Sequence, residues 1–184
     1  MEELALNILD VACNSVTAEA TLIDIDVSVD TKSDKLSISV SDNGKGMSKE
    51  LLEKVTDPFA TTRTTRKVGM GLPLFKMAAL TADGEFAIDS ETGVGTKTTA
   101  SFKLSHIDRM PLGDLPSTVV TLIGAAKSAD IVLKYAVDGR EFVFDTREIK
   151  KVLDGVDITE SEIIVWLKEM MKENIMLING GLAI

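Results

Sequence analysis

The segment Asp42-Asn-Gly-Lys-Gly-Met47 places a carboxylate and two glycines directly after a predicted β-strand. Leu22–Val29 and Lys35–Val40 both alternate apolar and polar residues, so they predict a β-hairpin that ends at Asp42. A buried carboxylate in this place can accept a hydrogen bond from a ligand's amino group, and the glycines let the backbone approach a flat ring. Taken alone, the segment is better explained as an Asp-Asn-Gly turn at the end of a hairpin.

A helix predicted for residues 2–17 carries a second pattern. Its surface is apolar almost all round, but Asn7, Asp10 and Asn14 form one polar stripe along it. Polar groups on a buried helix need partners, and a bound ligand is one candidate. The part of the stripe in Asp10-Val-Ala-Cys-Asn14 is therefore a candidate site.

Two glycine-rich segments follow, Val68-Gly-Met-Gly-Leu72 and Thr92-Gly-Val-Gly-Thr96. The first opens a helix predicted for Gly71–Leu80, with Pro73 in its first turn, where a missing N–H costs nothing. Backbone N–H groups at the start of a helix attract anions, and glycines leave them accessible. A plain helix start explains one of these two glycines but not both.

In this order and at these spacings, the four segments resemble the nucleotide site of the gyrase, heat-shock chaperone, histidine kinase and mismatch-repair ATPases, the GHKL superfamily. The resemblance covers residues 2–104 and is greatest to the histidine kinase-like ATPase domain. It implies an α+β protein with the Bergerat fold, a sandwich whose mixed, mainly antiparallel sheet is covered on one face by helices. Over its whole length the chain resembles a small ATP-binding family of anaerobic bacteria.

The resemblance implies a role for the residues of the four segments. Asp42 would accept a hydrogen bond from the amino group of adenine, and Thr96 would reach the same base through water, although Thr96 also suits a plain strand. Asn14 would coordinate the Mg²⁺ that bridges the three phosphates of ATP. The other nucleotide-binding residues that the resemblance implies are Gly44, Gly46, Met47, Gly69, Met70, Gly71 and Leu72.

Asp10 is the candidate catalytic residue. Several branches of the superfamily have a glutamate at this place that activates water or a substrate hydroxyl, and aspartate is one methylene shorter. A general base works within about 2.6–3.2 Å of the group that it deprotonates, or through one water. Asp10 is therefore a catalytic base, a residue that holds Mg²⁺-bound water, or only a polar residue of the helix.

Residues 57–68 are rich in threonine and basic residues and show no periodicity, so they predict a loop. The resemblance implies that this loop is the lid over the nucleotide, with Asp57-Pro-Phe-Ala-Thr-Thr-Arg63 similar to bacterial histidine kinases. Arg63, Arg66 and Lys67 would then close on the triphosphate. A solvated basic loop is the alternative explanation.

Composition restricts the function further. The 184 residues are 45% hydrophobic and 27% charged, as in ordinary globular proteins. The net charge of −9 is shared by both halves, so no basic surface is available for nucleic acid. No apolar run approaches the about 20 residues of a membrane span, and a single cysteine excludes an internal disulfide and favours the cytoplasm.

Two prolines and Gly113 lie between residues 105 and 116 and predict a boundary. We expect an ATP-binding domain over residues 1–105 and a small C-terminal α+β region over residues 106–184. In this second region the sequence predicts a helix over residues 117–127, then a hairpin of residues 131–144. The Asp138-Gly139 pair suits a type I′ turn in that hairpin.

A last helix is predicted to run to about Leu177, opened by a capping box at Thr159 and Glu162. Its apolar residues cover more width than one contact stripe needs: Ile163, Ile164, Trp166, Leu167, Met170 and Met171. We therefore expect the C-terminal region to meet a protein partner, a protein substrate or a second copy in a homodimer. Complete burial of the helix within the chain is the alternative.

Two functions fit the whole pattern, and the sequence leaves open whether the chain is an enzyme. The first is an ATP–Mg²⁺ enzyme that passes the γ-phosphoryl group to a protein side chain or to water. The second is an ATP-gated interaction module, whose lid controls partner binding with slow chemistry or none. The acceptor stays undetermined in either case.

Overall fold

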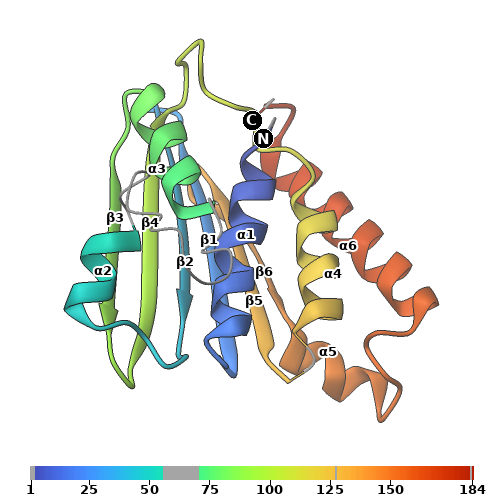
Figure 1. The fold of residues 1–184 in the computed structure, drawn as a ribbon. Helices are drawn as coiled ribbons and strands as arrows, with labels where there is room; N and C mark the ends of the chain where they lie inside the picture. Colours follow the sequence, from blue (N-terminus) through green and yellow to red (C-terminus); the bar gives the residue numbers. More distant parts are fainter. Residues whose placement is uncertain (1–2, 56–70, 127, 183) are drawn as a thin grey trace.

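The computed structural model describes residues 3–55, 71–126, 128–182 and 184. Within them, six strands form one sheet in the order β3-β4-β2-β1-β5-β6 (Figure 1). The strands are β1 (Leu22–Asp30), β2 (Lys35–Asp42), β3 (Phe86–Glu91), β4 (Gly95–Lys103), β5 (Asp130–Val137) and β6 (Arg140–Asp145). All neighbouring strands are antiparallel except β1 and β5, which confirms the predicted mixed, mainly antiparallel sheet.

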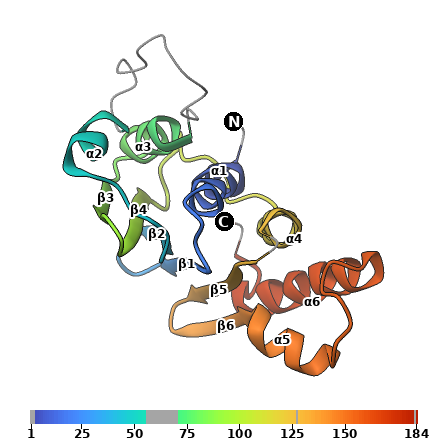
Figure 2. The same ribbon diagram turned by 60° about the horizontal axis from the view of Figure 1, so that its bottom comes forward.

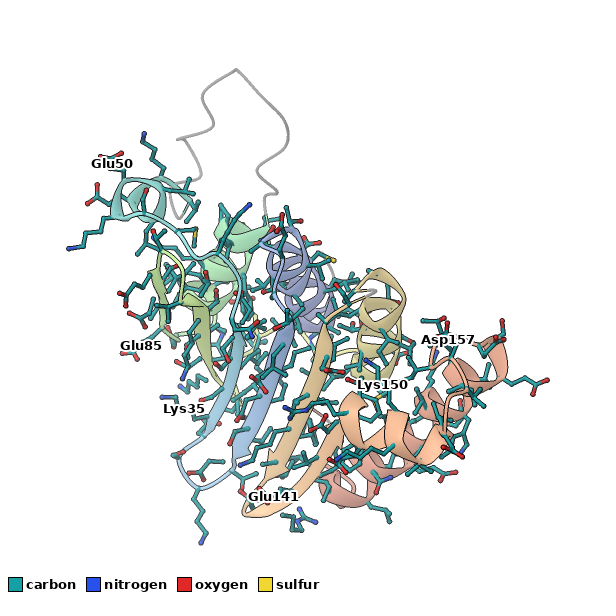
Figure 3. The ribbon with its side chains drawn as sticks, turned by 90° about the horizontal axis from the view of Figure 1, so that it is seen from below. Lys35, Glu50, Glu85, Glu141, Lys150 and Asp157 are labelled. Atoms are coloured by element: carbon teal, nitrogen blue, oxygen red, sulfur yellow. The ribbon has the colours of Figure 1, made fainter. Side chains whose placement is uncertain are left out.

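Helices pack on one face of this sheet, as Figures 1 and 2 show. The helices are α1 (Leu4–Thr17), α2 (Lys49–Val55), α3 (Gly71–Thr81), α4 (Leu115–Ala125), α5 (Thr146–Leu153) and α6 (Ser161–Asn179). α1 packs against both α3 and α4, while α6 packs against α4, β5 and β6. In Figure 3 the labelled Glu50 of α2 and Asp157, just before α6, lie at opposite ends of the molecule.

Alternation along the strands explains why only one face is covered. In β1 the residues Ile23, Ile25, Val27 and Val29 are all buried. The residues between them are acidic or serine and are partly or fully exposed. Because side chains of a strand alternate between the two faces of its sheet, the apolar face meets the helices and the polar face meets water.

The C-terminal strands extend the sheet of the first half. β5 pairs in parallel with β1 from Leu22↔Asp130 to Val29↔Val137, and β6 pairs with the outer side of β5. The helix α4 connects β4 to β5, so it forms the last part of the long connection between the parallel strands β1 and β5. The division at residue 105 stays a prediction about domains, but the sheet itself is continuous across it.

The structure agrees with some local predictions in the C-terminal region and corrects others. Asp138 and Gly139 have φ values of 50° and 83°, as a type I′ turn requires. The capping box at Thr159 is wrong, because the Thr159 hydroxyl donates to the Asp157 carboxylate at 2.8 Å. α6 begins after Glu160, without a side-chain cap. The sequence did not predict α5, whose first turn is capped by the carboxylate of Asp145.

The last helix is only partly buried. Leu167 and Met171 of α6 are fully buried, whereas Trp166 is 49% exposed and Leu177 is 75% exposed. The alternative of complete burial is therefore wrong for this helix. No helix in the described ranges combines the length and the apolar character that crossing a membrane would take.

We predict that the stability of the protein falls at high pH through its single tyrosine. Tyr135 of β5 is fully buried, and its hydroxyl donates to Asn179 Oδ1 of α6 at 2.6 Å. Burial raises the pKa of Tyr135 from 10.0 to about 12. Because the folded-state pKa lies above the unfolded one, this stabilisation is complete below pH about 10 and is lost as the pH rises through about 12.

Ultraviolet titration of the phenol measures this directly, since the chain contains one tyrosine. We expect ionisation near pH 12 in the folded protein and near pH 10 in the denatured chain, which serves as the control. Ionisation near pH 10 in the folded protein would contradict the buried position of Tyr135.

Candidate nucleotide-binding site

Asp42 ends β2 with its carboxylate held by two donors. The Ser15 hydroxyl of α1 donates to Oδ2 at 2.6 Å, and the Gly44 N–H donates to Oδ1 at 2.9 Å. Both oxygens keep acceptor capacity for a ligand, because a carboxylate has about four acceptor sites. Ser15 is 3% exposed, so its bond fixes the carboxylate between α1 and β2. Sequence reasoning missed Ser15, whose only signal is a hydroxyl next to Asn14 on an apolar helix.

Glycines let two backbone segments meet beside Asp42. Gly46 has a φ of +64°, and a Cβ there would overlap the carbonyl group of Glu91. Gly95 has a φ of +139°, and a Cβ there would overlap the carbonyl group of Asp42. The loop after β2 and the turn between β3 and β4 therefore touch through backbone atoms, which only glycine permits.

A second hydroxyl joins the same two loops. The Ser90 hydroxyl of β3 accepts a hydrogen bond from the Met47 N–H at 2.8 Å and donates to the Gly95 carbonyl at 3.0 Å. The Thr96 hydroxyl lies 2.8 Å from the Ser90 hydroxyl. Because the Ser90 proton is donated to Gly95, Thr96 donates to Ser90 and keeps only its lone pairs for other partners. No sequence pattern points to Ser90, since it lies in a polar stretch of a strand.

The polar stripe of α1 divides into an exposed and a buried part. Asp10 and Asn14 are exposed, whereas Asn7 is completely buried. A Cβ on Gly71 would lie 2.7 Å from Cβ of Asp10, so α3 can begin this close to α1 only with glycine there. The first N–H groups of α3 have no acceptors within the helix, so the start of α3 attracts anions. The Asp10 carboxylate lies beside this helix start. Leu72, the next residue, is 8% exposed and contributes its side chain to the core.

Five predicted site residues lie outside the described residues: Arg63, Arg66, Lys67, Gly69 and Met70. The predicted lid falls in the same range. The described residues therefore include the surroundings of Asp42 and the start of α3. The roles of all the predicted site residues in binding a nucleotide stay predictions.

The single cysteine and the single histidine of the chain have ordinary structural explanations. Burial raises the pKa of the Cys13 thiol, and the charge of Asp10 raises it further. Cys13 is thus protonated at neutral pH and unsuited to nucleophilic work. His106 accepts a hydrogen bond from the Asp108 N–H at Nδ1, at 3.1 Å, and its Nε2 lies 3.5 Å from an Asp83 carboxylate oxygen. These contacts suit a structural histidine.

The described ranges contain no group of three or more His, Cys, Asp or Glu residues that could hold a metal ion. A metal at Asn14 would therefore take most of its oxygen ligands from a bound phosphate and from water. Mg²⁺ commonly binds in this way, with one or two protein ligands.

Residues 1–106 match the family described as "Histidine kinase-, DNA gyrase B-, and HSP90-like ATPase". A "Putative sensor protein" of Shewanella frigidimarina is 31% identical over 109 residues, which cover 59% of this chain and 16% of that protein. "Sporulation kinase D" of Bacillus subtilis is 33% identical over 98 residues, which cover 53% of this chain and 19% of that protein.

A "Putative sensor histidine kinase NtrY-like" of Rickettsia conorii is 33% identical over 84 residues, 46% of this chain and 14% of that protein. The chain thus spans less than a fifth of the length of these relatives. Among solved structures, the N-terminal domain of a DNA repair protein has a TM-score of 0.53 at 15% identity, over 78% of this chain and 52% of that one. This last likeness concerns the fold alone.

The family match spans more than half of the 184 residues and includes α1, the turn after β2 and the start of α3, where the candidate site lies. The chain therefore belongs to the family of histidine kinase-, DNA gyrase B- and HSP90-like ATPases, whose model its residues 1–106 match.

Proposed function

We propose that the chain binds ATP with Mg²⁺ at this site and transfers the γ-phosphoryl group to a protein side chain or to water. The observation that carries the proposal is the contact between Asp10 and Gly71. It brings the one candidate base among the predicted site residues to the helix start where the phosphates are expected. Relatives that are named as kinases support phosphoryl transfer as the class of reaction.

Adenine would be recognised by Asp42. Its carboxylate is fixed by Ser15 and Gly44 but still has acceptor capacity for the amino group of adenine. Guanine presents a carbonyl oxygen at the same position, which a carboxylate repels. The lone pairs of Thr96 would accept from a water that also contacts the base.

Mg²⁺ would be held by the Asn14 amide oxygen together with phosphate oxygens and water. Asn14 lies one helical turn beyond Asp10 on the exposed side of α1. When bound, the ion would neutralise charge that develops on the phosphates.

Asp10 would act as the general base. Its carboxylate takes the proton of the acceptor hydroxyl, whose oxygen forms a bond to the γ-phosphorus while the bond from that phosphorus to the β-phosphate oxygen breaks. The products are a phosphorylated side chain and ADP, or inorganic phosphate and ADP when water is the acceptor. Aspartate is one methylene shorter than the glutamate found at this place in related enzymes. Asp10 would therefore take the proton of the acceptor hydroxyl directly or through one water.

The C-terminal region would supply the surface for a protein partner. The exposed side of α6 carries Val165, Trp166, Met176 and Leu177. A protein substrate, another partner or a second copy of the chain would cover this apolar surface.

We predict that the parent protein binds ATP in preference to GTP, and that Asp42→Asn weakens ATP binding by about 1–3 kcal/mol. The loss arises because the variant replaces a charged acceptor with a neutral amide. Titration calorimetry with both nucleotides measures it. Asp26→Asn on the opposite, exposed face of the sheet is the matched control and should bind as the parent does. Equal affinity of the parent for GTP and ATP would contradict the role of Asp42.

Asn14→Ala should weaken ATP binding strongly in Mg²⁺ and only slightly in the presence of a chelator. The difference is expected because this side chain acts through the metal. The same titration in the two buffers measures it, with the parent as reference. An equal loss in both buffers would mean that Asn14 is structural.

Asp10→Asn should lower turnover by roughly 10²–10⁴-fold and leave ADP affinity unchanged. The substitution keeps the shape of the side chain but removes the base. Release of phosphate from labelled ATP and phosphorylation of added protein are both followed, with Asp26→Asn again as control. Turnover that survives in Asp10→Asn would place the base elsewhere, and a parent without turnover would favour an ATP-gated interaction module.

A further inference from the structure

The outer edge of β6 is open, because β6 is the last strand of the sheet and pairs only with β5. The two-residue turn makes Val137 and Arg140 a hydrogen-bonded pair, and such pairs alternate along the hairpin. The N–H and C=O groups of Glu141 and Val143 therefore point away from β5. Both residues are exposed, and Figure 3 shows Glu141 at the margin of the molecule. An edge of this kind is a template for another strand.

The helix α6 lies at the same margin in the layer of helices. It packs on β5 and β6 and has α4 as its neighbour. Lys168 of α6 faces α4, because its Nζ lies 3.4 Å from Oδ2 of Asp114, the residue that caps α4. At about 100° per residue, Trp166, Met170 and Leu177 lie roughly 160–200° around the helix from Lys168. These three residues form the outer flank of α6, which faces away from α4 and lies above the open edge of β6.

The outer flank and the open edge both expose apolar side chains. Val143 is 52% exposed and Leu177 is 75% exposed. Leu177 lies near the middle of β6, because Tyr135, which is paired with Phe142, donates to Asn179 one helical step beyond Leu177. Apolar surface beside an unpaired strand favours a partner that supplies a strand and a helix together.

A second copy of the chain fits both surfaces at once. Neighbouring strands lie about 4.8 Å apart, so a two-fold axis that pairs two β6 strands lies about 2.4 Å from each of them. Since α6 packs on both β5 and β6, the two α6 helices would then lie about 10 Å apart, close to the 8–10 Å of packed helices. A lone peptide strand would cover the edge of β6 but leave the outer flank of α6 exposed.

Charges select one register for this pairing. A two-fold axis at Val143 would oppose Glu141 to Asp145 of the other copy, and an axis at Glu141 would oppose that residue to itself. Like charges directly opposite one another are destabilising. An axis at Phe142 opposes Glu141 to Val143 and leaves no two like charges of β6 face to face. Because Glu141 and Val143 both direct their backbone groups outward, each of these two pairs can exchange two hydrogen bonds.

We propose that the chain forms a homodimer in which two β6 strands pair antiparallel around Phe142 and two α6 helices pack through their outer flanks. The sheet of one copy then continues into the sheet of the other. This inference selects one partner among those considered for the C-terminal region, and it rests on no property of the nucleotide site. Its test uses no nucleotide, so its failure would leave the proposed ATP binding untouched.

Sedimentation of the full chain measures the association. At concentrations up to about 100 μM we expect a species of twice the 19.8 kDa of one chain. Leu177→Glu places a charge on the outer flank, and Val143→Pro removes an outward N–H that the pairing with β5 does not use. Each should weaken the association about ten-fold or more. Leu80→Glu is the matched control, because Leu80 is 56% exposed on α3, outside the proposed interface, and it should sediment as the parent does.

Cysteine cross-linking tests the register in a Cys13→Ser background. Phe142→Cys should give a disulfide-linked dimer on oxidation. The reason is that opposite residues of a non-hydrogen-bonded pair have Cα atoms about 4.5 Å apart, within the span of a disulfide. Val143→Cys should cross-link more slowly, because position 143 lies opposite Glu141 of the other copy.

Circular dichroism establishes that each variant is folded, and Leu177→Glu decides alone if Val143→Pro does not fold. A parent that stays monomeric would leave the edge of β6 to a different protein and would overturn the proposal. Unchanged association of folded Leu177→Glu, an equal loss in Leu80→Glu, or faster cross-linking of Val143→Cys than of Phe142→Cys would overturn it as well.

Discussion

The hydrogen bond of 2.6 Å between Ser15 and Asp42 connects the two elements on which the candidate site is built. Ser15 belongs to α1, the helix that also carries Asp10 and Asn14, whereas Asp42 ends β2. This one contact therefore holds Asp42, which is expected to bind adenine, in a set position relative to Asp10 and Asn14, which are expected near the phosphates. The Gly44 N–H completes the support of the carboxylate, so Asp42 is oriented by the fold before a ligand arrives.

Close backbone approach is the second constraint, and it explains why glycines recur at this place. Gly46 and Gly95 let the loop after β2 and the turn between β3 and β4 touch, and Gly71 lets α3 begin against Asp10. A side chain at any of these positions would have to displace a neighbouring segment. These glycines of the sequence pattern are thus required by the fold itself.

Local signals predicted much of this structure. The period-two alternation of β1 and β2 identified the hairpin, and the change of pattern at Asp42 identified the end of β2. The Asp138-Gly139 turn was predictable for the same reason, because its backbone preference lies in two adjacent residues.

Features that depend on distant segments were not predictable. The bonds of Ser90 depend on a loop 43 residues away. The parallel pairing of β5 with β1 likewise follows only from the packed fold. The missed cap of α6 has a local cause instead, because Asp157, two residues before Thr159, takes its hydroxyl.

A crystal structure of the chain with ADP and Mg²⁺ tests the central claim most directly. The account predicts the adenine amino nitrogen within about 2.7–3.2 Å of the Asp42 carboxylate, with the Ser15 bond intact. It predicts the phosphates at the start of α3, near Asp10 and Asn14. Adenine bound away from Asp42, or phosphates that leave the start of α3 free, would contradict it.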